Sequence, residues 1–104
     1  MSEKKKEKGP KTLLGIFEII PDLEESEDDE KTIKSMMDNI KTTIEGQGSI
    51  ESYKVEEIAY GAKKIVARIV FKEMDGGSQP LEDAIGTVEN VLRVECGMVS
   101  LSNQ

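Results

Sequence analysis

The chain has 104 residues, with one Cys, no His and no Trp, and its 14 basic and 21 acidic side chains give a net charge of −7. A chain of this length forms one small domain. One Cys excludes an intramolecular disulfide, and the lack of His excludes His-dependent triads and the usual zinc ligand sets from this chain alone.

The charges are divided unevenly along the first third of the chain. Residues 1–11 hold five Lys and two Glu, whereas residues 22–30 hold seven Asp or Glu and no base. Since 1–11 has no apolar residue after Met1, we predict a disordered Lys-rich tail there and a folded domain over 12–104. The tail is either a solvating arm or a weak electrostatic handle for RNA or the ribosome. The acidic body repels nucleic-acid phosphate, so we expect a basic protein partner and no direct nucleic acid binding by the folded body.

No part of the chain is apolar enough to suggest a membrane segment. The longest apolar runs are far shorter than the ~20 residues that span a bilayer, and no signal-peptide core follows the basic start. We therefore expect a soluble cytoplasmic protein without membrane contact.

The first elements in chain order are a strand and a helix. Residues 13–20 (LLGIFEII) are rich in β-branched and aromatic side chains and end at Pro21, which is typical of a strand. After the acidic stretch, apolar residues at spacings of three and four predict an amphipathic helix that ends near Gly46 and Gly48. These residues are Ile33, Met36, Met37, Ile40 and Ile44.

The second half of the chain predicts two more strands, a helix and a last strand. Residues 49–60 alternate imperfectly, which indicates a bulge or a shift between sheet and edge. Residues 63–71 alternate cleanly after a short link that favours an antiparallel pair. A turn at 75–78 leads to a helix that begins near Pro80, with Leu81, Ala84, Ile85 and Val88 as its apolar stripe. The last strand is predicted to place Leu92, Val94, Cys96 and Met98 on one face.

The element order is β-α-β-β-α-β, which predicts an α+β, ferredoxin-like, two-layer sandwich with an antiparallel four-stranded sheet and both helices on one face. The other sheet face would then stay open. We expect it to carry Lys64, Val66, Arg68 and Val70, as a partner surface or as ordinary exposed strand residues.

No residue pattern predicts a catalytic, cofactor or metal site. Glu56 and Glu57 are neighbours in a strand and so face opposite sides. The acidic stretch 22–30 lacks the spacing of a calcium loop, and Cys96 has no histidine base, so we interpret it as a small core residue. The Gly76–Gly77–Ser78 turn lacks the lysine of a phosphate loop.

Three segments carry a resemblance to a known family. They are 57–65 (EIAYGAKKI), 75–78 (DGGS) with 81–85 (LEDAI), and 88–91 (VENV). In order and spacing they resemble translation elongation factor 1-beta, closest to its short archaeal form, over roughly residues 13–99. The resemblance implies a guanine nucleotide exchange factor that promotes GDP release and GTP reloading on elongation factor 1-alpha, the GTPase that delivers aminoacyl-tRNA to the ribosome. It implies no covalent chemistry.

The resemblance also implies partner-binding residues. The aromatic–glycine pair of the family matches Tyr60 and Gly61, so Tyr60 would be an anchor, or else an aromatic packed on its own sheet. Lys63 and Lys64 match a basic pair that either touches the partner or keeps a strand edge soluble. The family usually has a basic residue near its C-terminus that reaches toward the magnesium site of the partner, but here the alignment reaches Leu101 and no base follows Arg93. The missing base leaves three alternatives: the C-terminal segment acts sterically on the partner, nucleotide exchange is slower, or exchange activity is lost.

Two other classes of function remain open from the sequence. One is a ferredoxin-like protein-binding or regulatory module that does not exchange nucleotide. The other is an enzyme of the acylphosphatase type, which is disfavoured because the first loop holds Pro21 and Asp22 where that chemistry needs an Arg and an Asn.

Overall fold

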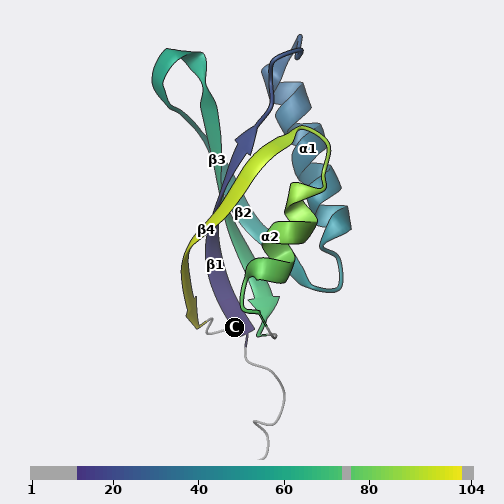
Figure 1. Ribbon diagram of the computed structural model, residues 1–104, viewed down its shortest axis with the longest axis vertical. Coiled ribbons are helices and arrows are strands. Elements are labelled where there is room, and N and C mark those ends of the chain that lie inside the picture. The colour runs from purple at the N-terminus through teal and green to yellow at the C-terminus, as the bar shows by residue number, and fades with distance from the viewer. Residues whose placement is uncertain (1–11, 74–75, 102–104) are drawn as a thin grey trace, which may run out of the picture.

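The computed structural model describes residues 12–73 and 76–101 (Figure 1). The predicted tail 1–11 lies outside the described residues. The elements follow in the predicted order: β1 (Thr12–Pro21), α1 (Asp29–Thr43), β2 (Gly48–Glu57), a short 3₁₀ turn η2 (Ala59–Gly61), β3 (Lys63–Lys72), α2 (Gln79–Gly86) and β4 (Val91–Leu101).

The strands form one antiparallel sheet in the order β2-β3-β1-β4. Both helices cover the same face of this sheet, and the opposite face is open (Figure 1). The ferredoxin-like α+β fold is therefore confirmed. The expected bulge in β2 is confirmed as well, since the register shifts between Ile50 and Ser52.

The core lies between the sheet and the two helices. Phe17 of β1 and Phe71 of β3 meet edge to face at its centre, with ring centroids 6.0 Å apart. A side chain at Gly15 would lie 2.7 Å from the Phe17 ring, so this position requires glycine. Of the predicted apolar positions of both helices and of β3, Ala84 is partly buried and the others are buried: Ile33, Met36, Met37, Ile40, Ile44, Ile65, Ala67, Ile69, Phe71, Leu81, Ile85 and Val88.

Helix α1 begins later than the acidic stretch does. Asp28 caps it by accepting a hydrogen bond from the backbone N–H of Lys31, and only Asp29 and Glu30 lie in its first turn. The preceding acidic residues belong to the β1–α1 connection. This connection therefore lies at the same end of the sheet as the β2–β3 hairpin, because β1 and β2 both end there (Figure 1).

The predicted phase of β4 is only partly right. Val94 and Cys96 pack against the core, but Leu92 and Met98 are each 65% exposed. Two register shifts of β4 against β1 explain the difference. Cys96 pairs with Phe17 and Met98 with Ile16, so Gly97 is an extra residue in β4. In the same way Leu92 is an extra residue between the pairs that β4 makes with Pro21 and Ile20. Each bulge moves the residues beyond it out of strict alternation.

Neither helix in the described ranges combines the length and apolar character that crossing a bilayer requires.

Candidate functional site

The link between β2 and β3 is a tight turn that holds Tyr60 outward. The backbone N–H of Ile58 donates to the Ala62 carbonyl at 2.8 Å, and that of Ala62 donates to the Ala59 carbonyl at 3.2 Å. Within these bonds Tyr60 has φ 60° and ψ 37°, and Gly61 has φ 76°. Glycine adopts this left-handed conformation freely, but an L-residue such as Tyr60 pays about 1–2 kcal/mol for it.

The Tyr60 side chain is fully exposed. The alternative that it packs on its own sheet is therefore wrong. An aromatic ring that is held in a strained turn and buries nothing contributes little to folding, and such strain collects at binding and switch sites. Tyr60 is accordingly the strongest candidate for contact with another molecule.

Lys63 and Lys64 leave the sheet on opposite faces at the base of the hairpin. The Lys63 ammonium lies 3.4 Å from Glu57 Oε2 and 4.0 Å from Asp29 Oδ2, which joins both strands of the hairpin to the start of α1. The side chains of both lysines are three-quarters buried or more.

On the open face, the Lys64 ammonium lies 3.6 Å from Glu18 Oε2 and 3.9 Å from Glu56 Oε1. The alternative that this pair protects a strand edge is wrong, because β3 lies inside the sheet. Val66, Arg68 and Val70 share this face with Lys64, as expected, because they alternate in β3 with the buried Ile65, Ala67 and Ile69.

Leu101 lies at the other end of the molecule from the Tyr60 turn. It is the last residue of β4, pairs with Leu13 and is 61% exposed. The structure thus brings Tyr60, Gly61, Lys63 and Lys64 together and separates Leu101 from them.

The turn borders a groove that sequence reasoning missed. Its volume is about 620 Å³, and it is formed by the end of β1, the acidic connection, the Tyr60 turn and Leu92. The alternation predicts Leu92 on the same strand face as Cys96, which packs against the core. The spacing of Val91 and Val94 is the sequence feature that points to the exposed position of Leu92. Both valines pack against the core, and two residues three apart share one strand face only if a bulge lies between them.

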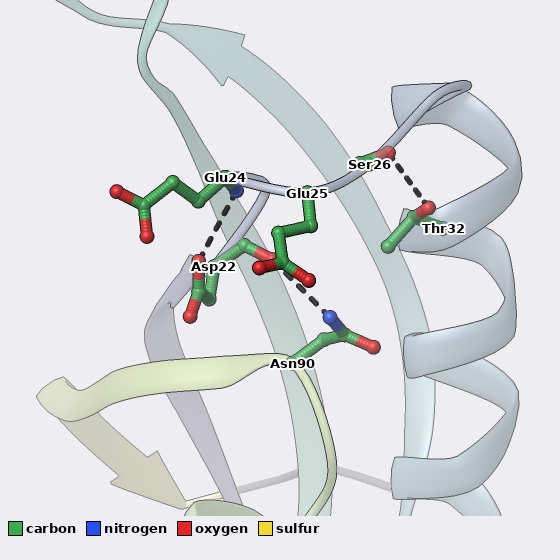
Figure 2. A pocket seen from close by; sticks show the side chains of 6 residues that line it. All are labelled: Asp22, Glu24, Glu25, Ser26, Thr32 and Asn90. Carbon is green, nitrogen blue, oxygen red and sulfur yellow. Dashed lines mark hydrogen bonds between the residues drawn. The ribbon is translucent and has the colours of Figure 1, made fainter.

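The acidic connection itself is ordered by hydrogen bonds (Figure 2). The backbone N–H of Asp22 donates to the Asn90 carbonyl at 2.7 Å, and Asn90 Nδ2 donates back to the Asp22 carbonyl at 3.2 Å. The hydroxyl groups of Ser26 and Thr32 lie 2.8 Å apart. The Glu24 carboxylate points away from that of Glu25 (Figure 2), and residues 12–73 and 76–101 contain no group of three His, Cys, Asp or Glu side chains arranged to hold a metal ion.

Cys96 is partly buried beneath the start of α2. Burial raises the pKa of the Cys96 thiol above its usual value, and the Glu82 carboxylate nearby adds to this effect. A thiol that stays protonated is a poor nucleophile, which agrees with a packing role.

Comparison with known proteins agrees with this geometry. The model of the EF-1 guanine nucleotide exchange domain matches residues 16–101, which includes the Tyr60 turn and ends at Leu101. The chain is 32% identical to elongation factor 1-beta of Thermoplasma acidophilum, covering 86% of this chain and 96% of that protein. It is 29% identical to elongation factor 1-beta of Methanocaldococcus jannaschii, covering 88% and 98%.

Among solved structures, the C-terminal domain of the MgtC protein from Mycobacterium tuberculosis resembles this chain with a TM-score of 0.52. The alignment covers 98% of this chain and 94% of that domain at 7% identity, so the likeness is one of fold alone.

The structure is a small α+β domain with an exposed aromatic turn. The family match makes the class specific, because exchange domains open the nucleotide site of a GTPase. The chain belongs to the EF-1 guanine nucleotide exchange domain family, and the relatives described above are elongation factors 1-beta.

Proposed function

We propose that this domain promotes GDP release from elongation factor 1-alpha during translation elongation, with Tyr60 as its main anchor. The observation that carries this proposal is the fully exposed Tyr60 in a left-handed turn before Gly61, within the stretch that matches the family model. The proposed partner works with ribosomes, which is consistent with the cytoplasmic location expected from the sequence.

The mechanism is ligand exchange and makes or breaks no covalent bond. If the domain binds the nucleotide-free GTPase more tightly than the GDP complex, it must weaken GDP binding by the same factor. GDP then leaves faster, and GTP fills the empty site. The chain needs no catalytic side chain of its own for this reaction.

Tyr60 suits the role of anchor for two reasons. Aromatic side chains that enter a partner pocket often supply 2 kcal/mol or more of the binding free energy. The turn is also formed before binding, since two backbone hydrogen bonds close it, and this reduces the conformational entropy lost on association.

Gly61, Lys63 and Lys64 support this anchor. Gly61 supplies the second left-handed residue of the turn, and the two lysines tie the hairpin base to acidic residues on both faces of the sheet. A fifth to a quarter of each lysine side chain remains exposed, so each can also donate a hydrogen bond to the partner.

Leu101 would provide a separate contact at the other end of the sheet. Because it is neutral, it cannot compete with the magnesium ion of the partner by charge. We propose a steric action there, in which the end of β4 displaces a segment of the nucleotide site.

The experiment that tests the function is release of fluorescent GDP from elongation factor 1-alpha of the same organism, chased with excess GTP. We expect substoichiometric amounts of this protein to accelerate release with turnover. Tight binding without acceleration would instead support the alternative, a protein-binding or regulatory module that does not exchange nucleotide.

A further inference from the structure

The groove beside the Tyr60 turn has an apolar residue from a distant part of the chain on its border. Leu92 is the extra residue of the β4 bulge next to the Pro21–Val91 pair, and its side chain is 65% exposed. It lines the same groove as Tyr60. The bulge thus withdraws a leucine from the core and adds it to the surface that carries the proposed anchor.

Acidic side chains line another part of this groove. Asp22 and Glu24 follow β1 and line it, and no salt bridge among the described residues involves either of them. The backbone fixes their position, because Asp22 is tied to Asn90 and its carboxylate accepts the N–H of Glu24 at 3.2 Å.

The basic residue that lines the groove is already paired within the protein. Lys63 is held by Glu57 and Asp29, so it does not neutralise Asp22 and Glu24. The groove therefore combines the exposed Tyr60 and Leu92 side chains with two carboxylates that form no salt bridge with another described residue. A partner surface that fits it has an apolar pocket with lysine or arginine side chains at its edge.

We propose that Leu92, Asp22 and Glu24 extend the Tyr60 contact into one docking groove for a basic surface of the GTPase partner. This inference rests on the proposed function for the identity of the partner. Charge complementarity and continuity with the Tyr60 turn favour this occupant over a second copy of the chain, because two copies would bring acidic borders together.

The apolar part of the groove is tested with two variants of β4. Leu92→Ser removes the groove leucine, and Met98→Ser is its matched control, since both side chains are 65% exposed in the same strand. We expect Leu92→Ser to weaken binding to nucleotide-free elongation factor 1-alpha at least tenfold in calorimetry. Met98→Ser should change the affinity less than twofold.

The acidic part is tested with two charge reversals of equal size. Glu24→Lys changes the groove, and Glu45→Lys makes the same change in net charge beyond the other end of α1, a helix of 15 residues and therefore about 22 Å long. We expect Glu24→Lys to weaken binding several-fold and to flatten its salt dependence. Glu45→Lys should do neither.

The outcomes separate this inference from the proposed function. The docking groove would be rejected if the two variants of either pair changed the affinity equally. It would also be rejected if the wild type bound and neither Leu92→Ser nor Glu24→Lys changed the affinity. If the wild type binds without accelerating GDP release and Leu92→Ser still weakens binding, the groove is supported and the exchange function is rejected. Thermal unfolding of each variant verifies that the fold is intact.

Discussion

Tyr60 and Leu101 lie at opposite ends of the same sheet. Leu101 pairs with Leu13 at the start of β1, whereas the Tyr60 turn lies beyond the end of β1. At about 3.3 Å per residue, β1 alone separates them by roughly 25 Å or more. A partner that binds both must offer two separate sites, one for an anchor and one for a displacing contact.

Replacing Tyr60 should affect binding without harming the fold. In Tyr60→Gly the left-handed strain disappears while no buried contact is lost, so we expect the free energy of unfolding to stay equal or rise by up to about 1 kcal/mol. Affinity for elongation factor 1-alpha should fall by about 2 kcal/mol, roughly 30-fold. Denaturant unfolding and calorimetry measure the two quantities.

The control for this prediction is Tyr53→Ala in β2, because Tyr53 is the other tyrosine of the chain and is 42% exposed. Its loss should leave the affinity unchanged. An equal loss of affinity in both variants would contradict the anchor role of Tyr60.

Gly61→Ala tests whether the shape of the turn matters for exchange. No atom lies within 4 Å of the added methyl group, so the effect is backbone strain, with an expected stability loss of about 1 kcal/mol. Gly46→Ala is the matched control, since Gly46 also has a positive φ and open space. Both should lose stability, but only Gly61→Ala should slow GDP release.

Leu101→Lys tests the neutral C-terminal position. The Leu101 side chain is largely exposed, so the substitution should change stability by less than about 0.5 kcal/mol. If residue 101 reaches the magnesium site of the partner, as we propose, a cation there competes with the metal and GDP release should be faster. If Leu101→Lys and Leu101→Gln release GDP equally fast, the contact is steric and charge plays no part.

Gly15→Ala should destabilise the core. The added methyl group would lie 2.7 Å from the Phe17 ring and 3.0 Å from the Phe71 ring, and forcing these rings apart costs about 1–3 kcal/mol. Gly97→Ala is the comparison, because its nearest neighbour, the Ile16 carbonyl oxygen, is 3.8 Å away. Thermal unfolding should show a clearly lower midpoint for Gly15→Ala than for Gly97→Ala.

The Cys96 thiol should react slowly with alkylating reagents. Burial raises its pKa, so less thiolate is present at pH 8 than in an unstructured peptide, and the reaction should be slower in the folded protein. The pH at which the rate reaches half of its maximum should be higher for the folded protein than for the urea-unfolded chain. Equal rates in the folded and the urea-unfolded chain would contradict this prediction.

Much of the architecture follows from the sequence alone. The stripe from Ile33 to Ile44 and the alternation in β3 predicted the buried faces correctly, because amphipathic periodicity is a local property of the chain. The short link at 60–62 also predicted the turn between β2 and β3, but only the structure showed that Tyr60 is exposed there. The element order predicted the fold class, and the resemblance of residues 57–65, 75–85 and 88–91 predicted the family.

The tertiary structure decided what local periodicity cannot encode. The bulges at Leu92 and Gly97 depend on the register of β4 against β1, and they turned Leu92 and Met98 toward solvent. The ion pairs of Lys63 and Lys64 join elements that are distant in the chain. The separation of Tyr60 from Leu101 follows from the antiparallel pairing of the strands. Register, strand order and long-range pairing result from packing the whole chain at once, and therefore only the folded molecule reveals them.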